Sequence, residues 1–305
     1  MAKIGFIGLG NMGAPMAANA VRAGHAVHGY DIAAARCAEA AAHGVEIAAD
    51  VGDAASGADI VVTMLNAGAT VVDVWTRVAP RLAPGALMID SSTIDVDSAR
   101  RAHAVAAEAG LLSLDAPVSG GVEGATAGTL TFMVGGSDEA FAKGQPLLAV
   151  MGRRIVHCGG AGAGDAAKIC NNMILGVSMI AVSEAFILGE SLGLSRQALF
   201  DVASNASGQC YALTTHCPVP GPVPGSAANR DYRPGFAAEL MAKDLRLSQD
   251  CARSSGAPTP IGAAASALYE RFVDAGGRGV DYAGVIRFIR EMEEQERAPI
   301  AKAGE

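Results

Sequence analysis

The sequence predicts an α/β fold class, with a Rossmann-type doubly wound parallel sheet followed by an all-α C-terminal domain. In the first half, short β-rich runs alternate with alanine-rich helical runs, which is typical of a parallel sheet covered by helices on both faces. A glycine-rich turn at residues 159–164 ends this alternation. Beyond it the pattern is helical, apart from a proline-rich loop at residues 218–225.

The expected strands are short apolar runs bounded by glycine or polar residues. The clearest lie at residues 3–8, 25–31, 59–65, 86–90 and 111–115. Two further runs, at residues 130–134 and 155–157, are expected to complete the sheet, and residues 14–23 are expected to form the first helix.

The chain has 305 residues, which is enough for two domains of ordinary size. We expect residues 1–162 to form the sheet domain and residues 163–305 to form the helical domain. The second domain should begin with a long helix of about 28 residues, for which Asp165 is the expected N-cap.

Charge and composition exclude several classes of partner. A net charge of −8 and a pI near 5.3 leave no basic field that would attract nucleic acid or an anionic membrane. The apolar run at residues 173–192 contains serines and glutamates whose burial in lipid would be costly. We therefore expect a helix buried in protein, and small molecules as ligands.

The six cysteines are scattered along the chain and form no C-x-x-C pair, which is unlike a disulfide framework or a zinc site. The six histidines include no H-E-x-x-H motif, so no metal is expected. Reduced thiols, and a first strand that follows Met1 almost at once, predict a cytoplasmic protein without a leader.

A G-x-G-x-x-G motif follows the first expected strand and precedes the first expected helix. It consists of Gly8, Leu9, Gly10, Asn11, Met12 and Gly13. Glycines here allow a tight turn and a close approach of a pyrophosphate, which then lies on the free N–H groups of the helix. In this context the motif predicts a dinucleotide site, whereas without it the motif would indicate only a turn.

Asp31, at the end of the second expected strand, stands where a dinucleotide fold has its ribose-binding acid. Its carboxylate would repel a 2′-phosphate, and neither Ile32 nor Ala33 supplies a cation to reverse that. The cofactor is therefore predicted to be NAD. The alternative is that Asp31 serves only as a helix N-cap or turn residue.

Two further segments carry candidate chemistry. Residues 115–121 lead from a strand into a glycine-rich loop whose N–H groups could face an anion, although alone it would be just a flexible loop.

Lys168, Asn171 and Asn172 share one face of the long helix. Burial would lower the pKa of a lysine toward values useful for proton transfer, so Lys168 is a candidate general base. The alternative is a lysine that extends to solvent.

Several motifs then stand in a recognisable order along nearly the whole chain. They occupy residues 8–16, 90–93, 115–121, 128–136, 168–173, 218–221 and 241–245. On these motifs the sequence resembles the β-hydroxyacid dehydrogenase family, most closely its 3-hydroxyisobutyrate dehydrogenase branch. The segments Lys-Ile-Cys-Asn-Asn-Met and Pro-Val-Pro-Gly point to that branch.

The resemblance implies roles for individual residues. Lys168 would be the catalytic lysine, Asn172 would hold the reacting hydroxyl, and Ser119 with the backbone of Gly120 and Gly121 would hold a substrate carboxylate. Cofactor contacts are implied for Leu65, Asn66, Thr93 and Lys243. The helical domain would serve substrate binding and assembly into a homodimer or homotetramer.

The implied reaction is NAD-dependent oxidation of 3-hydroxyisobutyrate to methylmalonate semialdehyde in valine breakdown. The alternatives are a related enzyme acting on tartronate, glyoxylate, succinic semialdehyde or 3-hydroxypropionate, and a silent dinucleotide-binding sensor. A 6-phosphogluconate dehydrogenase is disfavoured because its helical domain is much longer.

The sequence departs from the family pattern at three positions. Asn66 replaces a usual proline, Ala206 a common serine and Tyr211 a tryptophan. Because Ala206 and Tyr211 lie near the expected pocket, the exact hydroxy acid stays open.

Overall fold

The computed structural model describes residues 1–292, and the chain divides into two compact units, Met1–Ile169 and Cys170–Glu305. The division falls within helix α8 (Ala163–Ser191), whereas we expected it just before this helix. The reason is that the first turn of α8 is bonded to strand ends of the sheet unit. Residues 293–305 of the expected second domain lie outside the described residues.

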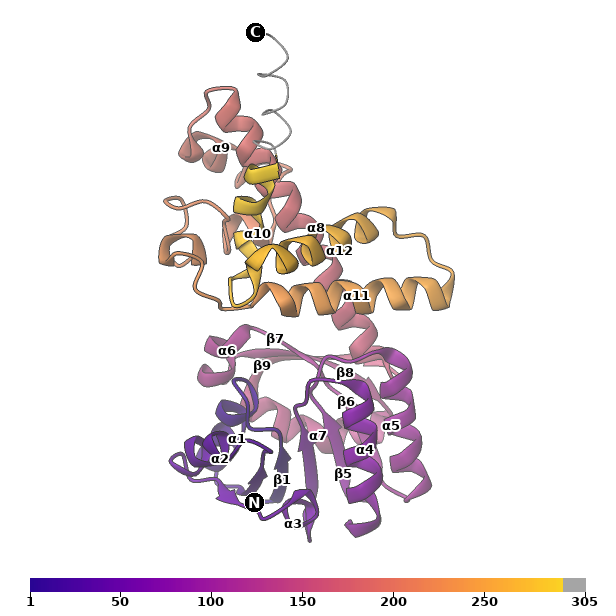
Figure 1. Ribbon diagram of the computed structural model, residues 1–305. Helices are drawn as coiled ribbons and strands as arrows, with labels where there is room; N and C mark the ends of the chain where they lie inside the picture. The colour runs from indigo at the N-terminus through magenta and orange to yellow at the C-terminus, as the bar shows by residue number, and fades with distance from the viewer. Residues whose placement is uncertain (293–305) are drawn as a thin grey trace. The chain divides into compact units, whose positions relative to one another are not determined.

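The sheet unit contains the predicted Rossmann-type sheet, with strand order β3-β2-β1-β4-β5-β6-β8-β7 and β9 paired to β8 (Figure 1). The strands are β1 (Lys3–Ile7), β2 (Ala26–Tyr30), β3 (Glu46–Ile47), β4 (Ile60–Thr63), β5 (Leu87–Asp90), β6 (Leu112–Asp115), β7 (Val118–Ser119), β8 (Leu130–Gly136) and β9 (Gly152–Gly159). Pairing is parallel from β3 to β6, while β8 runs antiparallel to β6 and β7. Strand order reverses between β1 and β4, the position at which such sheets bind ligands.

Every strand that we expected is present, and two strands within residues 1–292 were missed. The missed strands, β3 and β7, contain two residues each. A run that short has no periodicity, so its pairing depends on the neighbouring strand and not on its own pattern.

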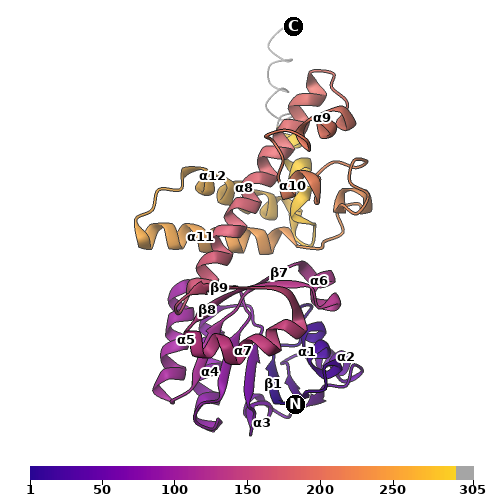
Figure 2. The ribbon, with the colours of Figure 1, turned by 180° about the vertical axis from the view of Figure 1, so that it is seen from behind.

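Helices cover both faces of this sheet. The helices are α1 (Gly13–Arg22), α2 (Ala34–Ala41), α3 (Val51–Ala55), α4 (Gly68–Val78), α5 (Val96–Glu108), α6 (Gly121–Ala127) and α7 (Asp138–Met151), with the short η1 (Ala79–Arg81). Along β4, Ile60 and Val62 join the core that includes residues of α1 and α7, while Val61 joins the core that includes residues of α4 and α5. The view from behind shows α7 in front of the strands (Figure 2). This two-sided burial explains why the central strands are continuously apolar.

The second unit is built of helices around one apolar core, as predicted. Its elements after α8 are α9 (Arg196–Ala203), α10 (Tyr211–Thr214), η2 (Ala227–Arg230), α11 (Ala238–Ser255), α12 (Pro260–Phe272), η3 (Val273–Gly277), η4 (Tyr282–Gly284) and a helical segment at residues 285–292. Met179 and Phe186 of α8 pack with Leu245 of α11 and Tyr269 of α12. Irregular backbone is more extensive than the proline-rich loop we expected, because residues 215–226 and 231–237 are also largely non-helical.

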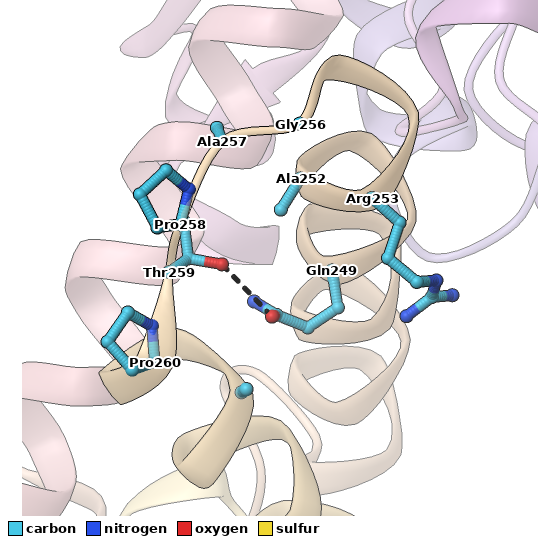
Figure 3. A pocket seen from close by; sticks show the side chains of 9 residues that line it. Gln249, Ala252, Arg253, Gly256, Ala257, Pro258, Thr259 and Pro260 are labelled. Atoms are coloured by element: carbon cyan, nitrogen blue, oxygen red, sulfur yellow. Dashed lines mark hydrogen bonds between the residues drawn. The ribbon is translucent and has the colours of Figure 1, made fainter.

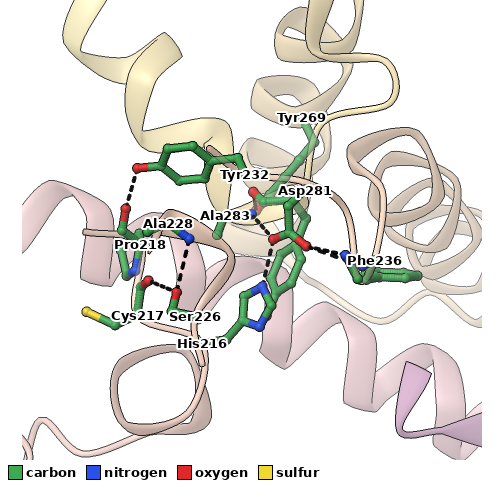
Figure 4. Close-up of polar contacts among 12 residues, drawn as sticks. His216, Cys217, Pro218, Ser226, Ala228, Tyr232, Phe236, Tyr269, Asp281 and Ala283 are labelled. Atoms are coloured by element: carbon green, nitrogen blue, oxygen red, sulfur yellow. Dashed lines mark hydrogen bonds and ion pairs between the residues drawn. The ribbon is translucent and has the colours of Figure 1, made fainter. Parts of the chain in front are cut away.

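A fully buried carboxylate organises that irregular region (Figure 4). Asp281 accepts hydrogen bonds from His216 Nε2 at 2.6 Å and from the backbone N–H groups of Gly235 at 2.9 Å and Ala283 at 3.0 Å. Tyr232 Oη donates to the carbonyl of Pro218 at 2.6 Å. These bonds satisfy buried polar groups and hold the loops onto the helical core.

Helix α8 is long and apolar enough to cross a membrane, judged by length and composition only. Within its most apolar window, 39% of the residues are buried. Met179 and Phe186 lie inside the core, whereas Ile174 and Leu188 are exposed. Our expectation of a buried helix is therefore right for one face of α8 and wrong for the other.

Candidate active site

The glycine-rich turn between β1 and α1 has two kinds of glycine. A Cβ atom added at Gly8 would lie 2.2 Å from the carbonyl oxygen of Met64, and one added at Gly13 would lie 1.9 Å from that of Gly8. At Gly10, by contrast, nothing lies within 4 Å of the added Cβ. Gly8 and Gly13 are thus required by packing, while Gly10 leaves open the space through which a pyrophosphate can approach the backbone.

Asp31 is bonded to this turn. Its Oδ2 accepts the N–H of Leu9 at 2.8 Å, and its Oδ1 accepts that of Ala33 at 2.8 Å. Asp31 therefore serves as a turn residue, which was the alternative, and it also stands where a ribose-binding acid is expected. Because the bond to Leu9 joins the end of β2 to the glycine turn, the carboxylate is held in place before any cofactor binds.

Sequence reasoning missed Arg36, a cation near the same turn. Arg36 Nη2 donates to Asn11 Oδ1 at 2.9 Å, and Nη1 lies 3.0 Å from Glu39 Oε2. We considered only the residues directly after Asp31, but the first turn of α2 brings Arg36 back toward the glycine turn. The available signal was a basic residue only five positions after Asp31.

Strands β4 and β5 end side by side, and a buried network joins their ends. Asp90 Oδ1 accepts hydrogen bonds from Thr63 Oγ1 at 2.7 Å and from Ser92 Oγ at 2.6 Å, and Ser92 Oγ accepts the N–H of Leu65 at 2.8 Å. Burial raises the pKa of Asp90 to about 6, although the bonds from Ser92 and Thr63 oppose this. The predicted cofactor residues Leu65, Asn66 and Thr93 directly follow these strand ends.

The predicted carboxylate-binding segment forms a sharp turn. Ser119 ends β7, and Gly120 and Gly121 follow with φ values of 133° and 63°. Side-chain-bearing residues rarely adopt such backbone angles, so glycine is needed at both positions. The turn leads directly into α6, which begins at Gly121.

Helix α8 carries the candidate base. Lys168 lies in the sheet unit and is 7% exposed, so the residue is largely removed from solvent. Our expectation that Asp165 caps this helix is wrong, because Asp165 lies inside the first turn and its Oδ1 accepts the N–H of Ile94 at 3.1 Å. The carboxylate that meets the start of α8 comes from Asp115, which accepts the N–H of Gly162 at 2.8 Å and of Asp165 at 3.0 Å.

In the helical unit, the structure brings together two predicted residues and one to which we had assigned no role. Asn172, one turn after Lys168 on α8, is 2% exposed and donates through Nδ2 to Asp244 Oδ2 at 2.5 Å. Lys243 Nζ lies 3.4 Å from Asp244 Oδ1. Asp244 stands inside a motif that we quoted, and its position beside Lys243 was the signal for it.

A separate hollow of about 500 Å³ lies between the end of α11 and the start of α12 (Figure 3). Gln249, Arg253 and Pro258 are among its lining residues, and Thr259 Oγ1 and Gln249 Oε1 are hydrogen-bonded at 3.1 Å. None of the predicted site residues lines it. We assign no chemistry to this hollow.

Comparisons with known proteins find family models that match both units of the chain. Residues 3–160 match the family model described as the NAD binding domain of 6-phosphogluconate dehydrogenase. Residues 162–289 match the model described as the NAD-binding of NADP-dependent 3-hydroxyisobutyrate dehydrogenase. Together the two models span both units.

Individual relatives are similar over almost the full length. A probable 3-hydroxyisobutyrate dehydrogenase of Mycobacterium tuberculosis is 51% identical over 290 residues, which cover 95% of this chain and 98% of that protein. An NAD-dependent L-serine dehydrogenase of Pseudomonas aeruginosa is 45% identical over 288 residues, covering 93% and 97%.

A solved structure of the Mycobacterium tuberculosis 3-hydroxyisobutyrate dehydrogenase, described as containing L-serine, matches with a TM-score of 0.93. The match covers 95% of this chain and 99% of that one at 51% identity.

Proposed function

The chain belongs to the 3-hydroxyisobutyrate dehydrogenase family of β-hydroxyacid dehydrogenases, and we propose that it oxidises 3-hydroxyisobutyrate to methylmalonate semialdehyde in valine breakdown. It is an NAD-dependent oxidoreductase that acts on CH–OH groups. The observation that carries the proposal is the buried Lys168, one helical turn before Asn172 and just after a helix start fixed to the sheet.

The proposed mechanism uses Lys168 as a general base. Its amine, neutral when oxidation begins, accepts the proton of the substrate hydroxyl as the carbon–oxygen bond gains double-bond character. NAD held at the glycine turn beside Asp31 would supply the acceptor for the hydride of the same carbon. The alcohol thus loses one proton and one hydride and becomes an aldehyde, and Lys168 holds the proton. Asn172 orients the hydroxyl, as the family resemblance implies.

The substrate carboxylate serves to position the reacting carbon. We propose that Ser119 and the backbone N–H groups at Gly120 and Gly121 bind it. The positive φ angles of both glycines support this assignment, because successive N–H groups in such turns form concave sites for anions. Positioning of this kind lowers the activation barrier of an enzyme reaction by several kcal/mol.

The residues of the sheet unit fit NAD. The free space at Gly10 would admit the pyrophosphate, and Asp31 stands at the end of β2 where the ribose hydroxyls bind. Leu65, Asn66, Thr93 and Lys243 are the further cofactor contacts that the family resemblance implies.

L-serine is the second candidate substrate. It is also a 3-hydroxy acid, and it carries an ammonium group where 3-hydroxyisobutyrate carries a methyl group. One relative is named an L-serine dehydrogenase, and a matching solved structure is described with L-serine. The chain also has Ala206 and Tyr211 where the branch commonly has serine and tryptophan, and Tyr211 is 57% exposed.

The test is an assay of NADH formation by the purified protein with 3-hydroxyisobutyrate, L-serine, 3-hydroxypropionate, glycerate and 4-hydroxybutyrate. We expect the highest kcat/KM with 3-hydroxyisobutyrate, with NAD preferred over NADP. A higher kcat/KM with L-serine would replace the substrate but keep the Lys168 chemistry. Absence of turnover with every acid would favour the silent cofactor-binding alternative.

We further propose that the protein is a homodimer or homotetramer. The family resemblance implies this assembly, and Ile174 and Leu188 of α8, which are 64% and 60% exposed, are apolar side chains that it would cover. Light scattering coupled to size-exclusion chromatography would measure the mass, and a monomer at micromolar concentration would contradict this.

A further inference from the structure

His103 lies outside every motif considered so far, yet it is part of a buried hydrogen-bonded chain. It stands on α5 with 10% of its side chain exposed. Its Nε2 lies 2.8 Å from Asp115 Oδ1, and its Nδ1 lies 2.7 Å from Ser113 Oγ. Because Asp115 can only accept while it is ionised, Nε2 carries a proton, and the Ser113 hydroxyl can serve Nδ1 in either role.

Asp115 in turn performs the work of a helix cap. The first N–H groups of a helix have no partner within it, and a side chain of the N-cap residue usually accepts one of them. Directly before Ala163, the first residue of α8, stands Gly162, which has no side chain. Asp115 accepts the N–H of Gly162 at 2.8 Å and that of Asp165 at 3.0 Å. Its negative charge also suits the positive end of the helix dipole.

The surroundings leave this carboxylate little freedom. A Cβ atom added at Gly135 would lie 2.4 Å from Asp115 Oδ1, and one added at Gly164 would lie 2.9 Å from Oδ2. Asp115 is 2% exposed. Burial alone would raise its pKa, but the hydrogen bonds from His103, Asp165 and Gly162 outweigh burial and hold the pKa below its usual range.

We propose that His103 is a positioning residue of the dehydrogenase reaction, acting through Asp115 to fix the first turn of α8 and so the place of Lys168. Lys168 follows Asp165 by three residues on a continuous helix, so a shift or fraying of the first turn moves its amine. The inference rests on the role given to Lys168 in the proposed function. It adds a residue of α5 that touches neither substrate nor cofactor.

The experiment compares His103→Leu, which removes both ring nitrogens, with His103→Gln, whose amide can donate to Asp115. Ser113→Ala is the matched control, because it removes the other partner of His103 and leaves the bond to Asp115. If His103→Leu does not fold, His103→Asn takes its place, since its shorter amide stops short of Asp115. All variants are made in the full chain.

The kinetic readout separates positioning from general damage. For His103→Leu we expect kcat to fall on the order of tenfold, because small displacements of a reacting group cost rate, while KM for NAD stays within about twofold. His103→Gln should recover most of that loss. Ser113→Ala should stay close to wild type.

The second readout is hydrogen–deuterium exchange of the peptide that contains residues 160–168. We expect exchange in His103→Leu to be at least about tenfold faster there, because the capped N–H groups lose a fixed acceptor. Peptides of α1 should exchange as in wild type.

Three outcomes would overturn the inference. They are unchanged exchange at residues 160–168, faster exchange with unchanged kcat, and equal loss of kcat and NAD affinity in both His103→Leu and His103→Gln. Failure of the proposed function is seen separately: a Lys168→Ala variant with normal turnover removes the base, while the exchange experiment still judges whether His103 anchors α8.

Discussion

The carboxylate of Asp115 accepts the backbone N–H of Asp165 at 3.0 Å, across fifty residues of chain. This bond joins the carboxyl end of β6 to the first turn of α8. Asp165 forms the matching link, because its own carboxylate accepts the N–H of Ile94 in the segment after β5. The end of β6 and the segment after β5 thus hold the helix that carries Lys168.

Lys168→Ala should lower kcat by about 10²–10⁴-fold, because a general base typically contributes that much to the rate. NAD binding, measured by calorimetry, should change little. Lys143→Ala is the control, since this exposed lysine of α7 donates to the carbonyl of Gly85, a residue outside the predicted site. Turnover near that of wild type in Lys168→Ala would remove the lysine from the mechanism.

Gly10→Ala and Gly13→Ala should separate binding from folding. An added Cβ at Gly10 meets open space, so the variant should fold with an unfolding midpoint close to that of wild type and bind NAD at least about tenfold more weakly. At Gly13 the added atom would lie 1.9 Å from the carbonyl oxygen of Gly8, so this variant should be destabilised by about 2 kcal/mol or more. Thermal unfolding and NAD titration measure both effects. Equal NAD affinity in Gly10→Ala and wild type would place the pyrophosphate elsewhere.

Asp31→Asn should weaken the preference for NAD. The amide keeps an acceptor oxygen for only one of the two N–H groups, of Leu9 or of Ala33, and loses the charge that repels a 2′-phosphate. We expect the ratio of kcat/KM for NAD to that for NADP to fall by about tenfold, which is about 1.4 kcal/mol of discrimination. Asp59→Asn is the matched control, because Asp59 makes a similar bond to the N–H of Lys3. An unchanged ratio in Asp31→Asn would mean that another group selects the cofactor.

Asp90→Asn should change how stability depends on pH. The pKa of Asp90 is raised to about 6 in the folded protein, above the unfolded value of about 3.9. The folded state therefore binds the proton more tightly, so stability is higher below about pH 4 and is lost as pH rises to about 6. Ionisation of Asp90 at pH 7 lowers the free energy of unfolding by about 3 kcal/mol, and asparagine removes that loss.

The measurement for Asp90 is the free energy of unfolding of variant and wild type from pH 4 to pH 7. The difference between the two should grow in favour of the variant as pH rises. This difference removes the opposite contribution of Asp115, whose lowered pKa stabilises the fold above its unfolded pKa. A difference that stays flat would show that Asp90 titrates normally.

Local sequence patterns were enough for the sheet and the cofactor turn. Strands β1, β2 and β4 to β6 are apolar runs bounded by turn residues. Such a run can be recognised from residues only a few positions apart. The glycine motif and Asp31 were likewise legible because their spacing follows from one strand, one turn and one helix. In the catalytic segment, the spacing of Lys168 and Asn172 was sufficient to predict that the two residues share one helical face.

Relationships between distant segments could not be read in this way. The sequence suggested Asp165 as the cap of α8, since aspartate before a helical run usually caps it, but the acceptor is Asp115 on another strand. Arg36 beside Asn11, Asp244 beside Asn172 and His103 beside Asp115 were likewise not anticipated as partners. Secondary structure is encoded by neighbours whose spacing is constant, whereas a buried charge is stabilised by whichever donors packing brings within about 3 Å of it. Such donors come from any part of the chain, so the complete fold selects them.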